Sequence, residues 1–327
     1  MSTTVTVYDD ATETWRLIEG DAPTLLAKLP DACVDAVVCD PPYSIAIGGA
    51  AWDRFDDGQA AGEAFERWTC TWAAEVLRVL KPGGHLAAFG APRTFHRLVA
   101  GIEDAGLEIR DQLLWLYAQG VPKSRRLPDG FGTALKPAYE PILLARKPFA
   151  GRTIDNIEAH GTGVLGIDAT RIRPAGTWPP HVALSHHERC HQDGCAEDCP
   201  AGMIDQARPD LLASRLFFCS KATRQEREAG CEQLPANDIQ LYPGKQRPPR
   251  VVRNVHPTVK PLALMRWLVR LVTPPGGLVL DPFAGSGSTG IASVLEGRRF
   301  VGIERESEFI DVACARLTHW TSGRERT

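Results

Sequence analysis

The sequence predicts an α/β protein built on a doubly wound sheet, and three observations support this fold class. Strand-like and helix-like segments alternate between residues 15 and 118 and again from about residue 213 onward. A glycine-rich turn, "DPFAGSGSTG", joins an apolar run to a helical segment. The stretch "CDPPYS" ends a second apolar run, "VDAVV", because proline cannot donate to a sheet ladder. Ligands bind at the carboxyl ends of strands in such sheets, so we expect a site at these two points.

Each expected element follows from its local pattern. Short apolar runs predict strands at residues 15–21, 34–40, 85–90, 109–118, 277–281 and 298–304. Apolar residues at helical spacing predict helices at residues 22–29, 64–84, 93–108 and 261–272 and after the glycine turn. The Lys-Pro-Gly-Gly sequence at 81–84 is expected to end its helix, and the tail after Arg316 is expected to fray.

The middle of the chain lacks this alternation of strand-like and helix-like segments. Glycine, proline, histidine and cysteine dominate residues 150–212, with only short apolar pieces such as "VALS". We interpret residues 150–212 as an irregular insert between two parts of one α/β domain, residues 1–149 and 213–327.

Composition and charge narrow the class of protein. The chain has 327 residues, of which 43% are hydrophobic, and this is ample for a large core. Residues 1–118 carry 9 basic against 18 acidic side chains, whereas residues 119–260 carry 20 against 15. The basic middle either faces a polyanion or is a solvated loop region. No apolar run approaches the ~20 residues of a membrane span, and no signal peptide is visible, so we expect reduced thiols in the cytoplasm.

The glycine turn predicts a nucleoside-containing ligand. Its G-x-G-x-x-G pattern lies between a strand and a helix, the context that gives this motif its value. Ile291 stands where a phosphate-binding P-loop needs lysine, which excludes that motif. Glu304 ends the next strand and can accept hydrogen bonds from ribose hydroxyls. Asp281 precedes the glycines, where it disfavours a pyrophosphate and favours an ammonium group. S-adenosylmethionine fits this pattern best, with a dinucleotide or a plain turn as the alternatives.

Three motifs in combination resemble a known family. "DPPYS" early in the chain, "HPTVKP" late and "DPFAGSGSTG" after it are similar to the amino-methylating DNA methyltransferases. Their order resembles the beta group, in which the catalytic tetrapeptide precedes the cofactor loop. The resemblance covers roughly residues 15–149 and 213–316. It implies a Rossmann-like methyltransferase sheet with a circularly permuted motif order, and a target-recognition role for the insert.

The resemblance also implies a chemistry for residues 40–43. The amine of a base is a poor nucleophile, because its lone pair is delocalised into the ring. Asp40 and the carbonyl of Pro41 can accept its two hydrogens and aim the lone pair at the methyl group, while Pro42 stiffens the turn. Tyr43 can stack on a base taken out of the helix. Whether Asp40 also removes the proton is left open. A capped turn is the alternative interpretation of this tetrapeptide.

The implied cofactor site draws on both parts of the chain. Asp21 resembles the family residue that reaches the adenine edge. Lys260 is either close to the cofactor carboxylate or a lysine at a helix entry. Trp52 and Asp53 either close over the target or cofactor or pack internally. The implied cofactor-binding residues are Asp21, Asp40, Lys260, Asp281, Phe283, Ala284, Gly285, Gly287 and Glu304.

The insert contains a cluster of metal-binding residue types. A run H-x2-C-x4-C-x3-C begins within "SHHERCHQDGCAEDCP", and four such ligands suit a tetrahedral structural zinc. The alternative is a loop with reduced surface cysteines. The expected ligands are His187, Cys190, Cys195 and Cys199.

Basic residues in and around the insert are expected to contact DNA. Phosphate contacts position a duplex, whereas base edges specify its sequence. We expect base reading from the insert, through arginines that contact guanine edges. The expected DNA-binding residues are Lys123, Arg125, Arg126, Arg171, Arg173, Arg247, Arg250 and Arg253.

The resulting hypothesis is methyl transfer to adenine N6 in double-stranded DNA. Tetrapeptides that begin with aspartate are mostly associated with adenine in this family, and cytosine N4 is the alternative target. A catalytically idle DNA-binding regulator that retains S-adenosylmethionine is the alternative from another class. We expect double-stranded DNA as the partner and no association with a membrane. Whether the chain forms a homodimer or acts beside a cognate restriction enzyme is left open. The resemblance implies a cytoplasmic, nucleoid-associated protein of a bacterial or phage-infected cell.

Overall fold

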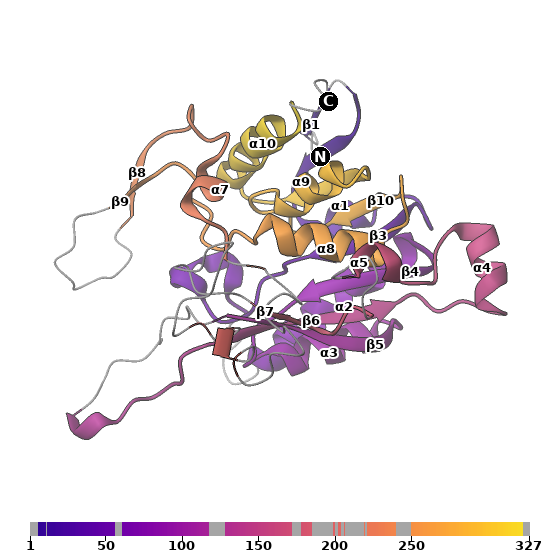
Figure 1. The fold of residues 1–327 in the computed structure, drawn as a ribbon, viewed down its shortest axis with the longest axis horizontal. Coiled ribbons are helices and arrows are strands. Elements are labelled where there is room, and N and C mark those ends of the chain that lie inside the picture. Colours follow the sequence, from indigo (N-terminus) through magenta and orange to yellow (C-terminus); the bar gives the residue numbers. More distant parts are fainter. Residues whose placement is uncertain are drawn as a thin grey trace.

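The computed structural model describes residues 6–10, 12–55, 61–117, 128–171, 178–184, 199, 202, 203, 206, 219, 221–239 and 250–322. Within these residues one nine-stranded sheet forms the centre of the molecule (Figure 1). Its strands lie in the order β1 (Val7–Asp9), β2 (Trp15–Glu19), β11 (Arg299–Glu304), β10 (Leu278–Asp281), β3 (Val34–Cys39), β4 (Leu80–Phe89), β6 (Tyr139–Arg146), β5 (Glu108–Leu116) and β7 (Val182–Leu184).

The strand directions confirm the doubly wound α/β class. The strands from β2 to β4 are mutually parallel, whereas β1 and β6 run antiparallel to their neighbours. The chain continues from β10 to β11 on one side and from β3 to β4 on the other. The strand order therefore reverses between β10 and β3, and ligands bind at the carboxyl ends of strands at such a point.

Helices cover both faces of the sheet. On one face lie α8 (Leu262–Val272), α9 (Ser288–Leu295) and α10 (Ser307–Thr321); α1 (Ala22–Leu26), α2 (Ala61–Val79) and α3 (Phe95–Asp104) pack on the other (Figure 1). Side chains alternate between the faces along each strand. In β3, Ala36 and Val38 contact the first helix layer, whereas Val37 and Cys39 contact the second. Burial on both faces explains why this strand is an unbroken apolar run.

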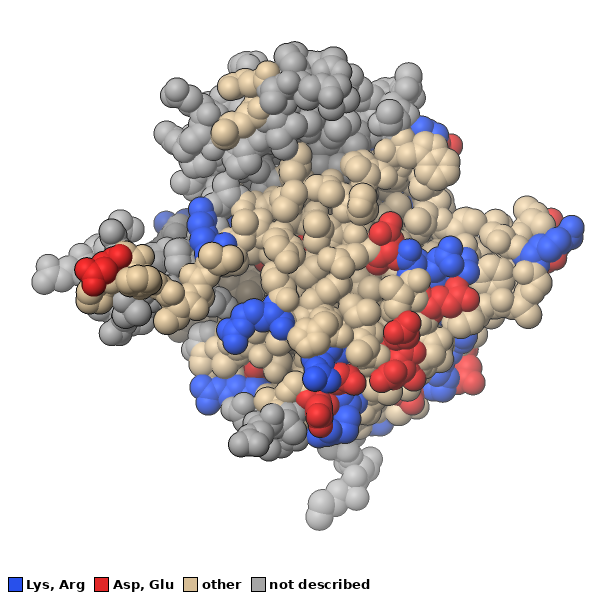
Figure 2. Space-filling view, turned by 90° about the horizontal axis from the view of Figure 1, so that it is seen from below, with Lys and Arg blue, Asp and Glu red and all other residues tan. Residues whose placement is uncertain are grey.

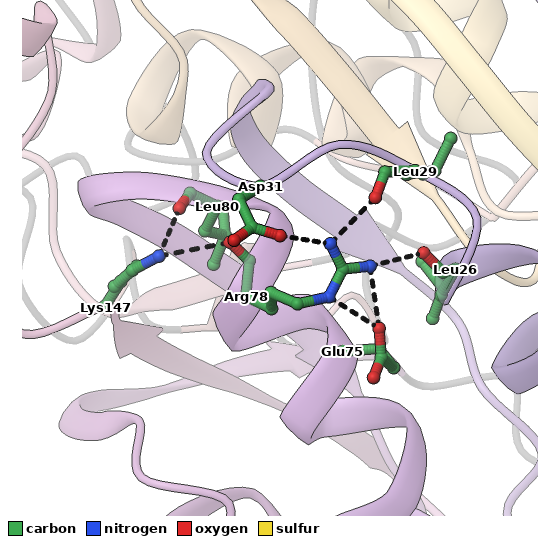
Figure 3. Close-up of polar contacts among 7 residues, drawn as sticks. All are labelled: Leu26, Leu29, Asp31, Glu75, Arg78, Leu80 and Lys147. Carbon is green, nitrogen blue, oxygen red and sulfur yellow. Dashed lines mark hydrogen bonds and ion pairs between the residues drawn. The ribbon is translucent and has the colours of Figure 1, made fainter.

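A single arginine joins two helices of the second layer (Figure 3). The guanidinium of Arg78, at the end of α2, donates to the carbonyls of Leu26 and Leu29, each at 2.8 Å. It also pairs with Asp31 at 2.6 Å and Glu75 at 2.8 Å. The Leu26 carbonyl is at the end of α1, and the Leu29 carbonyl lies in the segment that follows this helix. Arg78 thus fixes the helix that leads from β2 toward β3.

Two local predictions were wrong. The expected helix over residues 64–84 already ends at Val79, and the Lys-Pro-Gly-Gly sequence expected to close it belongs to β4. The reason is backbone pairing with the end of β6: Gly83 donates to Lys147 and Lys147 donates to Gly84. The tail after Arg316 does not fray there, because α10 continues to Thr321 and Leu317 is fully buried.

The residues between β6 and α8 contribute several short elements. They are α4 (Thr153–His160), α5 (Ile167–Thr170), β7, α7 (Arg224–Glu228), and a separate two-stranded sheet of β8 (Asn237–Ile239) and β9 (Arg250–Val252). Buried Asn156 ties α4 to the central sheet by donating to the carbonyl of Pro82 at 3.0 Å. Among the described residues, short 3-10 helices also lie at Ile47–Gly49, Ala51–Asp53 and Pro128–Gly130.

Over the described ranges, no helix has the length and apolar character needed to cross a membrane.

Candidate active site

The two strand tips singled out in the sequence meet in space. Asp40 directly follows β3, Asp281 ends β10, and these strands are neighbours in the sheet. A cleft that is open to solvent lies at this point. Its walls include the tetrapeptide 40–43, the turn 281–286 and the residues Asp21, Lys260 and Glu304. Residues far apart in the chain thus form one concavity at the strand-order reversal.

The glycine turn needs its glycines for steric reasons. Gly285 and Gly287 have φ values of +50° and +77°, in the left-handed region that favours glycine. A Cβ atom on Gly285 would also lie 2.6 Å from Nε2 of His256. The turn therefore brings bare backbone to the cleft wall, and Gly287 starts helix α9.

Glu304, at the tip of β11, holds this turn in place. Its Oε2 accepts a hydrogen bond from the backbone N–H of Gly285 at 2.8 Å. Its Oε1 accepts from the N–H groups of Arg305 and Glu306 at 2.8 and 2.9 Å. Burial raises the pKa of this carboxyl, and the backbone hydrogen bonds oppose that shift. Glu304 lines the cleft as well, so one side chain both shapes the turn and faces the cleft.

Asp281 is a buried carboxylate beside the same turn. Its side chain is 2% exposed and accepts a hydrogen bond from the N–H of Phe283 at 2.9 Å. Burial raises its pKa to about 7, although a hydrogen bond from Thr289 opposes this. Among the described residues, no lysine or arginine is paired with it. A desolvated carboxylate that faces a cleft without a cation is suited to a positively charged ligand.

Asp40 belongs to a buried network of four polar side chains. The hydroxyl of Tyr43 donates to Oδ1 of Asp40 at 2.5 Å, and Nζ of Lys260 donates to Oδ2. Glu140 Oε2 lies 3.2 Å from the Tyr43 hydroxyl and 3.4 Å from Nζ of Lys260. Strands β3 and β6 and the segment before α8 therefore meet at the tetrapeptide 40–43.

Burial and charge act in opposite directions within this network. Burial raises the pKa of Asp40, Lys260 lowers it, and Glu140 raises it again. Burial lowers the pKa of Lys260, but the two carboxylates outweigh this effect and hold it above the ordinary value. Burial and the same carboxylates raise the pKa of Tyr43 well above its usual value. Lys260 therefore stays charged and Tyr43 stays a neutral donor.

Sequence reasoning missed Glu140. It lies at the start of β6, whose first residues reach the active-site edge because this strand runs antiparallel to β4. The rule that ligands bind after the carboxyl end of a strand therefore does not point to it. Further contacts extend from it, since the hydroxyl of Tyr117 hydrogen-bonds Glu140 and Nζ of Lys221 lies 3.7 Å from the centre of the Tyr117 ring.

The sequence predicts no role for His256, the first residue of "HPTVKP". It lines the cleft, and its ring packs edge-on against Phe309 with the ring centres 4.6 Å apart. Burial, together with nearby Lys260 and two arginines, lowers its pKa to about 3. It is therefore a neutral wall residue near physiological pH.

Trp52 and Asp53, adjacent in the loop after the tetrapeptide, lie in different surroundings in the structure. Trp52 lines the cleft, with its ring 6.5 Å from that of Phe309. Asp53 is fully buried and points back toward the tetrapeptide loop. The two neighbours therefore do different things, one facing the cleft and the other the protein interior.

Comparison with known proteins identifies the family. A family model described as DNA methylase, of the N6/N4 methyltransferase type, matches residues 34–315. The chain belongs to this family of DNA methylases. The match includes both strand tips and the cleft between them, so the DNA methylase assignment agrees with the observed geometry.

Relatives and solved structures agree with this assignment. The methylase is 23% identical over 342 residues to the type II methyltransferase M.HindIII of Haemophilus influenzae, covering 89% of this chain and 91% of that protein. It is 26% identical over 302 residues to the DNA adenine methyltransferase YhdJ of Escherichia coli, covering 92% and 82%.

Two solved structures share the fold. The PvuII DNA methyltransferase (cytosine-N4-specific) has a TM-score of 0.56 at 16% identity and covers 95% of this chain and 92% of its own. TTHA0409 of Thermus thermophilus has a TM-score of 0.50 at 22% identity and covers 93% and 94%. At these identities the likeness shows the fold, which is that of Rossmann-like DNA methyltransferases.

Few of the DNA-binding residues expected in the methylase belong to the described part of the structure. Arg171 pairs with Asp168 at 2.7 Å, and Arg253 donates to the carbonyl of Leu234. On the face shown in Figure 2, the described basic side chains are interspersed with acidic ones rather than gathered in one patch. The residues Lys123, Arg125, Arg126, Arg173 and Arg247 and the side chain of Arg250 lie outside the described part of the structure.

Most of the expected zinc ligands of the methylase also lie outside the described part of the structure. His187, Cys190 and Cys195 are not among the described residues, and Cys199 is buried. In the part of the chain that the structure describes, no group of three or more metal-binding side chains occurs.

Proposed function

We propose that this methylase transfers a methyl group from S-adenosylmethionine to the N6 amine of adenine in double-stranded DNA. One observation supports this most: the Asp40 carboxylate, held by Tyr43 and Lys260, borders a cleft that also contains the buried, cation-free Asp281. A hydrogen-bond acceptor for an amine and a binding site for a cationic donor therefore lie side by side.

The cleft fits the proposed cofactor. Asp281 suits its positive charge, Glu304 can accept from ribose hydroxyls, and Asp21 lies at the tip of β2 within reach of the same cleft. Phe283, Ala284, Gly285 and Gly287 complete the proposed contacts. When bound, S-adenosylmethionine supplies an electrophilic methyl group on a sulfonium.

The residues of the chain itself prepare the amine. Asp40 and the carbonyl of Pro41 accept its two hydrogens, which localises the nitrogen lone pair. Lys260 and Tyr43 fix the Asp40 carboxylate, so no reorganisation is needed when positive charge develops on nitrogen. Tyr43 offers a ring for stacking of an extruded base. Catalysis in this account is mainly positioning and electrostatic stabilisation.

The choice of adenine rests on two observations. The tetrapeptide begins with aspartate, and a relative that spans 92% of this chain is named a DNA adenine methyltransferase. The family also includes enzymes for cytosine N4, so the target base is the part of the proposal that most needs a direct test.

Product analysis tests the proposal. The protein is incubated with tritium-labelled methyl donor and unmethylated plasmid, and the DNA is digested and its nucleosides are separated. We expect label in N6-methyl-2′-deoxyadenosine from double-stranded DNA and none in an RNA control. Label in N4-methylcytosine would overturn the choice of base, and no label despite bound cofactor would support an idle regulator instead.

Two further roles belong to the same proposal. Residues 150–212 recognise the target sequence, and His187, Cys190, Cys195 and Cys199 hold a structural zinc that folds this segment. Metal analysis of the purified protein should give one zinc per chain. A metal-free protein that still recognises its site would remove the zinc proposal and leave the rest intact.

A further inference from the structure

Asp53 receives an unusual set of hydrogen bonds. Its side chain is 0% exposed, and all its recorded partners are backbone N–H groups. Oδ1 accepts from Tyr43 at 2.6 Å and Ser44 at 2.7 Å; Oδ2 accepts from Ile45 at 3.2 Å and Ile47 at 2.8 Å. An ionised carboxylate has about four lone-pair sites and no donor, so it matches four converging N–H groups.

The backbone around Asp53 has the shape of an anion-binding nest. Ser44 and Ala46 have φ values of 58° and 51°, a conformation that residues other than glycine seldom adopt. Alternation of left-handed and ordinary residues turns successive N–H groups toward one side. The N–H of Ala46 also donates to the carbonyl of Asp53 at 3.2 Å. The loop therefore depends on an internal anion to hold its shape.

This nest connects the two working parts of the site. Tyr43, whose N–H binds Asp53, places its hydroxyl on the catalytic Asp40. Ile47, whose N–H also binds Asp53, lines the cofactor cleft, as does Trp52 beside it. One buried carboxylate thus fixes both the tetrapeptide and a wall of the cleft.

We propose that Asp53 is the positioning residue of the catalytic loop, with its carboxylate serving as the internal anion that shapes residues 43–47. The inference rests on the proposed methyl transfer for its kinetic effect, but the shape of the loop can be measured without it. Asparagine cannot replace the carboxylate, because its NH₂ group would face N–H donors instead of accepting from them.

Chemical rescue tests the need for an anion. Asp53→Ala should leave a space lined by the four N–H groups, and formate should enter it. We expect the single-turnover rate of Asp53→Ala to be about 100-fold lower than that of the wild type, a magnitude typical for loss of a preorganising contact. Formate should raise the rate of this variant by about tenfold or more. Asp53→Asn should be as slow and unresponsive to formate, since its amide fills the space.

Asp35 provides a matched control. It is also a buried aspartate and accepts a backbone hydrogen bond, from Leu278 at 2.7 Å, but it pairs with Lys81 and does not line the cleft. Asp35→Ala should lower the thermal unfolding midpoint, with no formate-dependent gain in the rate per folded molecule. A formate effect of equal size in this variant would show general stabilisation and overturn the assignment.

A second measurement does not depend on activity. Arg54 directly follows Asp53, so trypsin cleavage after Arg54 reports the order of this loop. Cleavage should be faster in Asp53→Ala and Asp53→Asn than in the wild type, and formate should slow it only in the alanine variant. This result is expected even if the wild type proves to methylate nothing. A folded Asp53→Ala variant with wild-type resistance to trypsin and a wild-type single-turnover rate would overturn the proposal. So would a variant in which formate changes neither the cleavage rate nor the single-turnover rate.

Discussion

Replacement of Lys260 by methionine removes the cation from the buried network. Lys260 is 5% exposed, pairs with Asp40, and lies 3.4 Å from Glu140. Methionine keeps most of the side-chain volume, so the main change is the loss of charge. The two carboxylates, each with a side chain 18% exposed, then lose the lysine that they share, which favours proton uptake or hydration at one of them.

The size of the effect follows from this arrangement. Removal of one partner from a buried ion pair typically costs about 3–5 kcal/mol of folding stability. Protonation limits that cost: the pKa of Asp40, already raised by burial, rises further once Lys260 no longer lowers it. Because the folded state then binds the proton more tightly than the unfolded state, the stability of the variant should fall as pH rises.

Activity should change with pH in the opposite direction to stability. In the proposed mechanism methyl transfer uses ionised Asp40, so the variant should be at least about 100-fold slower near pH 7, the range seen when a preorganised charge contact is lost. Its rate should recover in part as pH rises, because the acid limb of the profile moves to higher pH.

Single-turnover rates between pH 6 and 9, with urea unfolding at the same pH values, measure both effects. Lys147→Met is the matched control, since Lys147 is a half-buried lysine that donates to the carbonyls of Arg78 and Leu80 and does not line the cleft. Its acid limb should stay within the wild-type range. A Lys260→Met profile with an unmoved acid limb and a normal plateau would refute the role given to this network.

Three further predictions concern single side chains. The affinity for S-adenosylmethionine should weaken about tenfold from pH 8 to pH 6, because Asp281 with a pKa of about 7 loses its charge over this range, and calorimetry on Asp281→Asn should show a flat dependence. Gly285→Ala should lower stability by about 2 kcal/mol and weaken cofactor binding, since its Cβ meets His256 and its φ is left-handed; wild-type stability in denaturant unfolding would contradict this. Glu140→Gln should move the acid limb of the rate profile to lower pH, because Glu140 raises the pKa of Asp40; a shift to higher pH would exclude this electrostatic role.

The sequence indicated the main features of the site because they follow from parallel-strand geometry. Asp40 and Asp281 each end an apolar run, and parallel strands place such ends at one edge of the sheet. The alternation of strands and helices was visible because both faces of the sheet are covered. These features depend on local patterns that a single sequence contains.

Local patterns did not indicate that Glu140 and Lys260 surround Asp40. Glu140 lies at the start of β6 and is 97 residues from Tyr43 in the sequence. It reaches the site only because β6 pairs antiparallel with β4. Lys260 reaches Asp40 across 220 residues, which no local spacing reports. The role of Asp53 depends on backbone dihedral angles of a loop, which side-chain patterns do not reveal.

The most direct test of the role of Asp40 is Asp40→Asn, which keeps the shape of the side chain and removes its charge. The single-turnover rate of methyl transfer and the dissociation constant for S-adenosylmethionine are measured on the same preparation. We predict a rate at least about 1000-fold lower, as for loss of a principal electrostatic group, with the dissociation constant within about threefold of the wild type. Undiminished transfer would show that this carboxylate does not prepare the amine.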